Sequence, residues 1–329
     1  MNITKRTLLQ GLLTAPALAA PALILTGAQK AAAQTNTDGH MAQVPGYYRY
    51  WVGDIEITAL LDGYMAIPHT FVLGYDDTAA RESTKKAYRR FTEDQVGFPV
   101  NGYVIKTGSE VILLDTGAPS ALAPTVGGLV ANLRAAGFDP KDITTVLMTH
   151  LHVDHVGGLL NKDGEKQFGN ARFICAQAEW DYLYNDDVYN AAPDDFRFVL
   201  DLARQSVAPY TDQQSLFTGE KELITGITSI PLHGHTPGHT GYVIHSQGES
   251  LLIWGDVIHL STMQFAHPEW GVVFDADSEQ AKKTRIAMFD RASADQIAVA
   301  GMHIDFPGIG YVERSGGSYR YVSAPWMPA

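Results

Sequence analysis

The sequence predicts a single layered α/β domain, and three observations support this prediction. Apolar residues make up 45% and charged residues 18% of the 329 residues, a composition typical of a globular chain with a sizeable core. Short apolar runs typical of strands come in two groups, with helix-favouring segments after several of them. No linker-like segment separates the two groups, so we expect one domain over residues 47–329.

The first 33 residues have the layout of an export signal peptide. Lys5 and Arg6 are followed by an uncharged run from 7 to 29 and by the small-residue pattern Ala31–Ala33, which predicts cleavage before Gln34. The segment resembles a twin-arginine signal with Lys in place of the first Arg. An uncleaved membrane anchor is the alternative, and four residues that disfavour a spanning helix argue against it: Gly11, Pro16, Pro21 and Gly27. We therefore expect a periplasmic or secreted protein without stable membrane insertion.

The first half of the remaining chain begins with a polar segment, 34–46, which predicts a flexible arm. Alternation of apolar and polar residues over 47–61 then predicts strands, and Asp62-Gly63 is a hairpin signal. The next expected elements are a surface helix within 76–94, strands at 103–107 and 111–114, a helix over 124–137, a strand at 145–148, and helices at 178–184 and 196–205.

The second half repeats this style. The expected elements are strands at 227–232, 241–244 and 250–254, a helix over 278–291, a strand at 296–300, and a terminal hairpin over 310–322 that turns at 315–318.

Composition also excludes several classes of function. Acidic residues outnumber basic ones 36 to 24, which argues against nucleic-acid binding because phosphates require a basic face. The single cysteine, Cys175, excludes an internal disulfide framework and a cysteine-rich metal cluster. The most informative residues are the 12 histidines, because several are spaced as metal ligands.

The densest motif is His150-Leu-His152-Val-Asp154-His155, directly after a buried strand. Four ligand-capable side chains in six residues exceed what one tetrahedral metal takes from so short a segment, so the spacing favours two adjacent metals. Imidazole and carboxylate donors without a thiolate favour zinc, although manganese, cobalt and iron use the same set.

Further ligands are expected where other strands end. His235, Asp256 and His303 each follow an apolar run, and a carboxylate between two cations bridges them, which suits Asp256. The expected groups are His150, His152 and His235 for one metal and Asp154, His155 and His303 for the other, with Asp256 shared.

Three other side chains have expected roles near these ligands. Asp115, at the end of a strand, either orients a ligand histidine or caps a turn, and both readings stay open. His259, three residues after Asp256, is a candidate for moving a proton to the leaving group. His239 is expected to pack or form a hydrogen bond.

Together these residues resemble the metallo-β-lactamase superfamily, and within it the methyl parathion hydrolase subgroup of organophosphorus hydrolases. The resemblance extends from Pro45 to the C-terminal hairpin. It rests on the ligand motifs and on the segments Asp115-Thr-Gly-Ala, Ala192-Pro-Asp-Asp, His233-Gly-His-Thr-Pro-Gly-His-Thr, Gly255-Asp and Phe306-Pro-Gly-Ile-Gly.

This resemblance implies an αββα sandwich with a binuclear site along one edge. It implies a hydrolase in which a metal-bridging hydroxide cleaves phosphotriesters, lactones or aryl esters, with small molecules as substrates. The alternatives are a quorum-quenching lactonase with only incidental phosphotriesterase activity, and a non-catalytic metal-binding protein of the cell envelope. We also expect a homodimer.

Two departures from the resemblance concern the substrate pocket. The positions that carry aromatic rings in the subgroup correspond here to Leu122, Leu183 and a residue near Phe198, which predicts a pocket with fewer rings. Quorum-quenching lactonases carry a tyrosine where this chain has His259.

Overall fold

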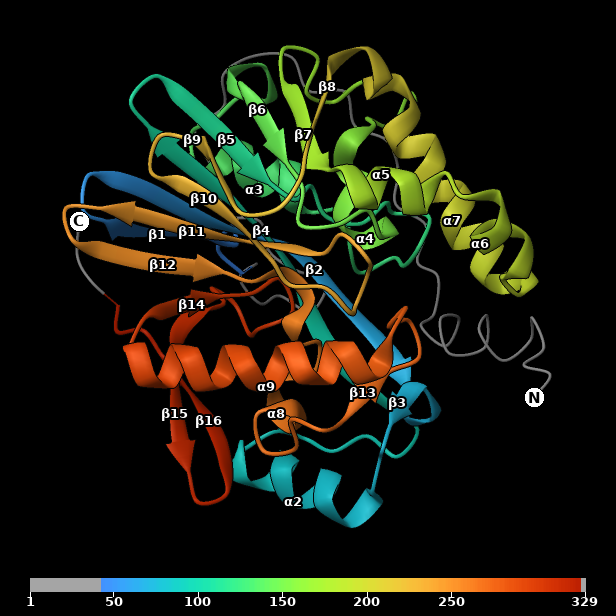
Figure 1. Ribbon diagram of the computed structural model, residues 1–329, viewed down its shortest axis with the longest axis vertical. Helices are drawn as coiled ribbons and strands as arrows, with labels where there is room; N and C mark the ends of the chain where they lie inside the picture. The colour runs from blue at the N-terminus through green and yellow to red at the C-terminus, as the bar shows by residue number, and fades with distance from the viewer. Residues whose placement is uncertain (1–42, 327–329) are drawn as a thin grey trace.

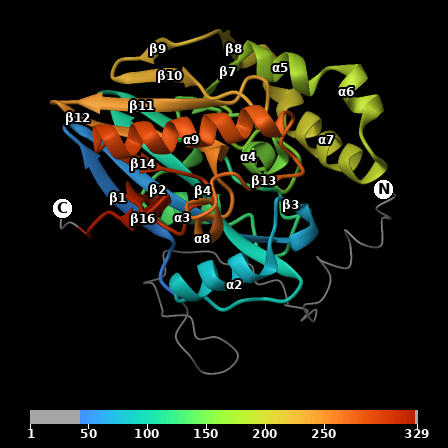
Figure 2. The ribbon, with the colours of Figure 1, turned by 60° about the horizontal axis from the view of Figure 1, so that its bottom comes forward.

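Two seven-stranded sheets lie face to face in the computed structural model, which describes residues 43–326 (Figures 1 and 2). The first sheet has the order β1-β2-β4-β5-β6-β7-β8, and the second has the order β16-β15-β14-β12-β11-β10-β9. A two-stranded ribbon pairs β13 with β3. The strands are β1 Tyr47–Val52, β2 Ile55–Pro68, β3 Val72–Leu73, β4 Gln95–Thr107, β5 Glu110–Leu114, β6 Thr145–Leu147, β7 Arg172–Ala176, β8 Gln214–Phe217, β9 Lys221–Ile224, β10 Ile227–Pro231, β11 Thr240–Ser246, β12 Glu249–Ile253, β13 Gly271–Val272, β14 Ala298–Ala300, β15 Ile309–Ser315 and β16 Ser318–Ser323.

Helices cover the outer face of each sheet. The α-helices are α2 Asp77–Lys86, α3 Leu129–Ala135, α4 Val153–Val156, α5 Gln177–Leu183, α6 Asp186–Ala191, α7 Asp194–Val207, α8 Ser261–Gln264 and α9 Ser278–Asp295. The short 3-10 helices are η1 His69–Phe71, η2 Pro140–Asp142, η3 Gly157–Leu159, η4 Ala208–Gln213 and η5 Gly255–Val257. In Figure 1, α9 lies along the second sheet, and α3, α5 and α7 lie with the first. Within the described residues, no helix is long and apolar enough to cross a bilayer.

Three layers of buried side chains account for this arrangement. Between the sheets, residues such as Ile105 and Ile244 form one apolar core. A second core joins the outer face of the first sheet to α3, α5 and α7, and a third joins the second sheet to α9 through Phe289. Because each sheet is apolar on both faces, it needs a partner on both sides, and the αββα sandwich expected from the sequence is confirmed.

One turn prediction was wrong. Asp62-Gly63 does not form a hairpin, because β2 continues through it with a shift of register against β4. The Asp62 carboxylate accepts hydrogen bonds from the backbone N–H groups of Ala118, Gly127 and Leu129 at 3.0–3.1 Å, so it fixes a loop beside the strand. The first hairpin turns earlier, between β1 and β2.

Several helix lengths also differ from the prediction. The helix expected over 124–137 is only Leu129–Ala135, because Asp62 holds the preceding residues in a loop. The helix expected over 278–291 extends to Asp295. The terminal hairpin, β15 to β16, turns where the sequence predicts.

The expected signal peptide, 1–33, lies outside the described residues, as does most of the expected arm. At the end of the arm, Gly46 is held by its N–H to Asn132 Oδ1 at 2.9 Å and by its carbonyl, which accepts from Leu61 N at 2.8 Å. Gly46, the residue just before the expected boundary at 47, is therefore bonded to the domain.

Candidate metal centre

Seven expected ligands meet at one edge of the sandwich, although they come from four separate segments of the chain. His150 and His152 follow β6, and Asp154 and His155 lie in the first turn of α4. His235 follows β10, Asp256 lies in η5 after β12, and His303 follows β14. Because β5 and β6 run parallel, as do β12 and β14, their carboxyl ends face the same edge.

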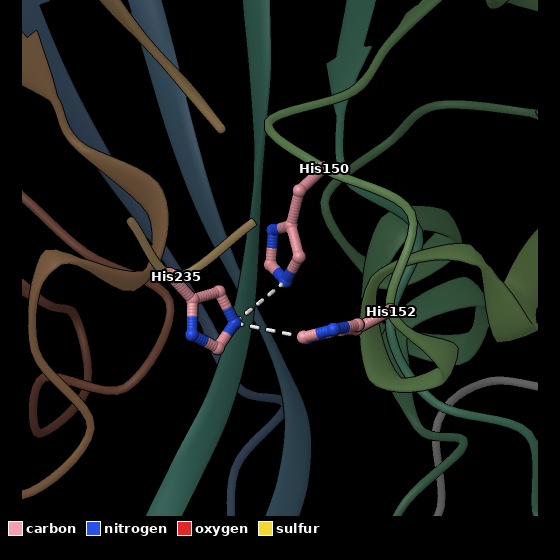
Figure 3. Close-up of side chains that lie close together, drawn as sticks. All are labelled: His150, His152 and His235. Atoms are coloured by element: carbon pink, nitrogen blue, oxygen red, sulfur yellow. Dashed lines mark hydrogen bonds between the residues drawn. The ribbon is translucent and has the colours of Figure 1, made fainter. Parts of the chain in front are cut away.

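The first group of donors consists of three imidazoles that point toward a common centre (Figure 3). His235 Nε2 lies 3.2 Å from His150 Nε2 and 2.9 Å from His152 Nδ1. These nitrogens arrive from two loops that are 83 or more residues apart in the sequence.

The second group consists of Asp154, His155 and His303, with Asp154 Oδ2 3.4 Å from His303 Nε2. Asp256 lies between the two groups. Its Oδ2 is 3.2 Å from His303 Nε2 and 3.3 Å from His155 Nε2, and it is 3.4 Å from His235 Nε2 and 3.7 Å from His150 Nε2. This is the position that a bridging carboxylate requires.

The donor set fits two divalent cations. Within the described residues, His155 Nε2 and Asp256 Oδ1 are buried and have no hydrogen-bond partner, an arrangement that is costly unless another group binds them. The donors are imidazoles and carboxylates without a thiolate, as zinc and similar metals accept.

The two groups differ in electrostatics. Burial, together with the neighbouring imidazoles, lowers the pKa of His152 to about 3 and that of His235 to about 4, so these rings are neutral and have free lone pairs. Burial would also lower the pKa of His155, but Asp256 and Asp154 raise it well above its ordinary value. The carboxylates of Asp256 and Asp154 therefore stabilise positive charge at the second group.

Hydrogen bonds to the far nitrogens orient several of these rings. Asp115 Oδ2 lies 2.7 Å from His155 Nδ1, and Asp115 also accepts from Thr149 N at 2.9 Å and Thr149 Oγ1 at 2.7 Å. His303 Nδ1 donates to the carbonyl of Pro99 at 2.8 Å. Asp115 thus orients a ligand histidine, as one of the two readings expected, and its other bonds fix the start of the loop after β6 and not its own turn after β5.

Asp275 performs the same task for His235, with Oδ1 2.8 Å from Nδ1, and it was not among the residues predicted from the sequence. It lies 40 residues after His235, outside every ligand motif. Asp275 reaches the His235 ring only in the folded chain, so no local sequence pattern identifies it.

The two remaining histidines near the site have different surroundings. His239 Nδ1 donates to the Leu232 carbonyl at 2.8 Å and Nε2 accepts from Asp256 N at 2.9 Å, so its expected hydrogen-bonding role is confirmed. His259 Nε2 lies 3.1 Å from Asp256 Oδ2, and the ring stacks on His303. Within the described residues, neither ring nitrogen of His259 has a hydrogen-bond partner.

A cavity of about 970 Å³ opens over the metal ligands. His152, Asp154, His235, Asp256 and His259 line its polar end. The other walls are mainly apolar and carry five aromatic rings: Phe71, Phe98, Tyr182, Phe196 and Phe274.

The cavity corrects two of the three expected pocket residues. Leu122 lines it, as expected. Leu183 does not, because it is 3% exposed within the core beneath the first sheet. Phe198 is 54% exposed, and Phe196 lines the cavity instead. Side chains two positions apart on an α-helix differ by a rotation of about 200°, so Phe196 and Phe198 on α7 point in nearly opposite directions. Whether this pocket has fewer rings than those of the organophosphorus-hydrolase subgroup stays a prediction.

Comparisons with known proteins agree with this geometry. Residues 96–295 match the family description of the metallo-beta-lactamase superfamily. The crystal structure of the hydrolase AbOPH, in the beta lactamase superfamily, is similar with a TM-score of 0.82 and 32% identity, covering 87% of this chain and all of that one. The structure of AidC, a dizinc quorum-quenching lactonase, has a TM-score of 0.78 at 24% identity, covering 86% of this chain and 99% of that one.

Among curated relatives, an N-acyl homoserine lactonase of a Bacillus species is 24% identical over 168 residues, which is 45% of this chain and 59% of the relative. The N-acyl homoserine lactonase AttM of Agrobacterium fabrum (strain C58) is 31% identical over 120 residues, 36% of this chain and 41% of the relative. The chain thus spans about three fifths or less of these two relatives.

Fold and donor clusters together define a metal-dependent hydrolase, rather than the non-catalytic alternative. The chain belongs to the metallo-β-lactamase superfamily.

Proposed function

We propose that this hydrolase opens neutral lactones as its principal reaction and also cleaves aryl esters and phosphotriesters. The observation that carries the proposal is the 970 Å³ cavity, which joins apolar walls to the ligand cluster. No Lys or Arg lines this cavity within the described residues, so it offers no cation for an anionic substrate. Its aromatic and aliphatic walls favour an uncharged ester with an apolar substituent.

When bound, two divalent cations, most simply zinc, supply a water nucleophile activated near neutral pH and a Lewis acid for the oxygen of the scissile bond. The chain supplies the geometry: Asp256 is shared between the two donor groups, and Asp115 and Asp275 fix the orientation of His155 and His235. His259 lines the cavity beside Asp256. We assign to it the role of general acid, which donates a proton to the leaving oxygen. The apolar walls keep bulk water from the reacting bond.

Lactone opening is supported by the similarity to lactonases in sequence and fold. The five rings of the cavity favour aryl phosphotriesters as a second class, because ring faces bind aryl leaving groups. The expected homodimer stays a prediction.

The test is a substrate panel with the zinc-loaded protein. We expect kcat/KM for an N-acyl homoserine lactone to exceed that for paraoxon and for a cephalosporin, with p-nitrophenyl acetate detectably cleaved. A higher value for the cephalosporin than for every lactone and ester would contradict the proposal.

We further propose that the protein is exported, on the basis of Lys5, Arg6 and the Ala31–Ala33 pattern. Mass spectrometry of the protein from the envelope of its native host is expected to find an N-terminus near Gln34. Recovery of the intact Met1 terminus from the cytoplasm would refute this proposal.

A further inference from the structure

A buried carboxylate that plays no part in the reaction joins two of the loops that carry metal ligands. Glu179, on α5, is 1% exposed. Its Oε2 accepts a hydrogen bond from Leu151 N at 3.1 Å, and Leu151 stands between His150 and His152. One side of this carboxylate therefore holds the loop after β6.

The other oxygen holds the loop after β10. Glu179 Oε1 accepts from Gly238 N at 2.8 Å and from the hydroxyl of Thr236, the residue directly after His235. The loop passes so close to α5 that a Cβ atom on Gly238 would lie 2.5 Å from Glu179 N. Glycine at this position lets the backbone reach the carboxylate.

Stability alone is a poor explanation for this group. Among residues 43–326, no Lys or Arg acts on the Glu179 carboxylate, and burial raises its pKa to about 7. A buried acid without a cation is costly even when it is hydrogen-bonded. Its three donors all belong to two segments that together supply His150, His152 and His235.

We propose that Glu179 is a positioning residue that sets the separation of these two loops, and thereby the affinity of the three-histidine group for its metal. Within the described residues it forms no hydrogen bond with a ligand ring, so it acts through the residues next to the ligands, unlike Asp115 and Asp275. The inference rests on the proposed metal centre but not on any particular substrate.

The test replaces Glu179 by Gln and titrates the metal-free protein with Zn²⁺ against a chromophoric chelator. The amide keeps one acceptor but places an NH₂ against a backbone donor, so one loop is released. We expect one of the two zinc affinities to fall about 10- to 100-fold, the usual effect of losing a residue that supports a metal ligand, while the other is unchanged. Excess Zn²⁺ is expected to restore kcat without changing KM.

Asp62→Asn is the matched control, because Asp62 is a buried carboxylate, 4% exposed, that accepts three backbone hydrogen bonds away from these loops. It is expected to lower the melting temperature but to keep both zinc affinities. Wild-type affinities in Glu179→Gln, or an equal loss of affinity in both variants, would overturn the proposal.

Thr236→Val removes only one of the three donors and keeps the test decisive if Glu179→Gln does not fold. We expect a smaller loss of the same single affinity, and no loss would count against the proposal. If the zinc affinities change as expected while the wild-type protein cleaves none of the panel substrates, the positioning role stands and only the proposed function fails.

Discussion

Asp256→Ala is expected to lower kcat/KM by at least about 10³-fold, the upper range for removing one preorganised electrostatic group, and to reduce the tightly bound metal from two ions toward one. The reason is the central position of the carboxylate. Its Oδ2 lies within 3.7 Å of five imidazoles, those of His150, His155, His235, His259 and His303. Without it, Asp154 is the one carboxylate left among the seven expected ligands.

Metal content by elemental analysis and steady-state kinetics on the same preparation measure the two effects together. Asp212→Ala is the control, since that carboxylate is exposed and pairs with Lys166 on the surface. One bound metal with full activity in the wild-type protein would contradict the binuclear assignment. So would an Asp256→Ala variant that keeps two tightly bound ions.

The expected ligands could be located from the sequence because each lies only a few residues after the end of a strand. A strand that ends in a buried apolar run, such as β6, predicts where its next residues lie, and the carboxyl ends of neighbouring parallel strands share an edge. Asp115 and His150 follow neighbouring strands of the first sheet, Asp256 and His303 follow neighbouring strands of the second, and the packing of the two sheets brings these two edges together. The same reasoning placed Asp115 beside the ligands.

Asp275 and Glu179 could not be found in this way. Asp275 follows the short strand β13 and Glu179 follows β7 inside α5, so a position after a strand does not distinguish them from ordinary acidic residues, and neither lies in a ligand motif. Their contacts are fixed by how layers pack, which depends on side chains from the whole domain. An acidic residue in a helix is ordinarily exposed, and only the tertiary structure shows that Glu179 is buried.

The prediction of the pocket residues was wrong for a related reason. Leu183 and Phe198 were assigned by correspondence in sequence, but the walls of the cavity are set by which face of α5 and α7 turns inward. One residue of offset on a helix rotates the side chain by about 100°, which is enough to move it from a cavity to the core or to solvent. The rings from β4, η1 and the segment before α9 come from regions outside the ligand motifs.

Replacing two cavity rings is expected to change substrate choice more than catalytic power. Phe196→Leu together with Phe274→Leu removes ring faces but keeps an apolar wall. Each aromatic contact contributes about 0.5–1.5 kcal/mol beyond its buried area, so losing two costs about 1–3 kcal/mol. We therefore expect kcat/KM for an aryl phosphotriester to fall about 5- to 150-fold, while that for an aliphatic lactone changes far less.

Two single variants separate the cavity from the core. Leu122→Phe adds a ring to the wall and is expected to raise aryl phosphotriester kcat/KM selectively. Leu183→Trp adds a ring of larger size to a packed core, so it is expected to destabilise the fold by about 1–3 kcal/mol and to leave the ratio of the two activities unchanged. Thermal unfolding and paired kinetics on paraoxon and a lactone measure both effects. The nucleophile is the same for both leaving groups, so only the walls of the binding site can change the ratio of paraoxon to lactone kcat/KM. If Leu183→Trp shifts this ratio and Leu122→Phe does not, the substrate binds elsewhere than in this cavity.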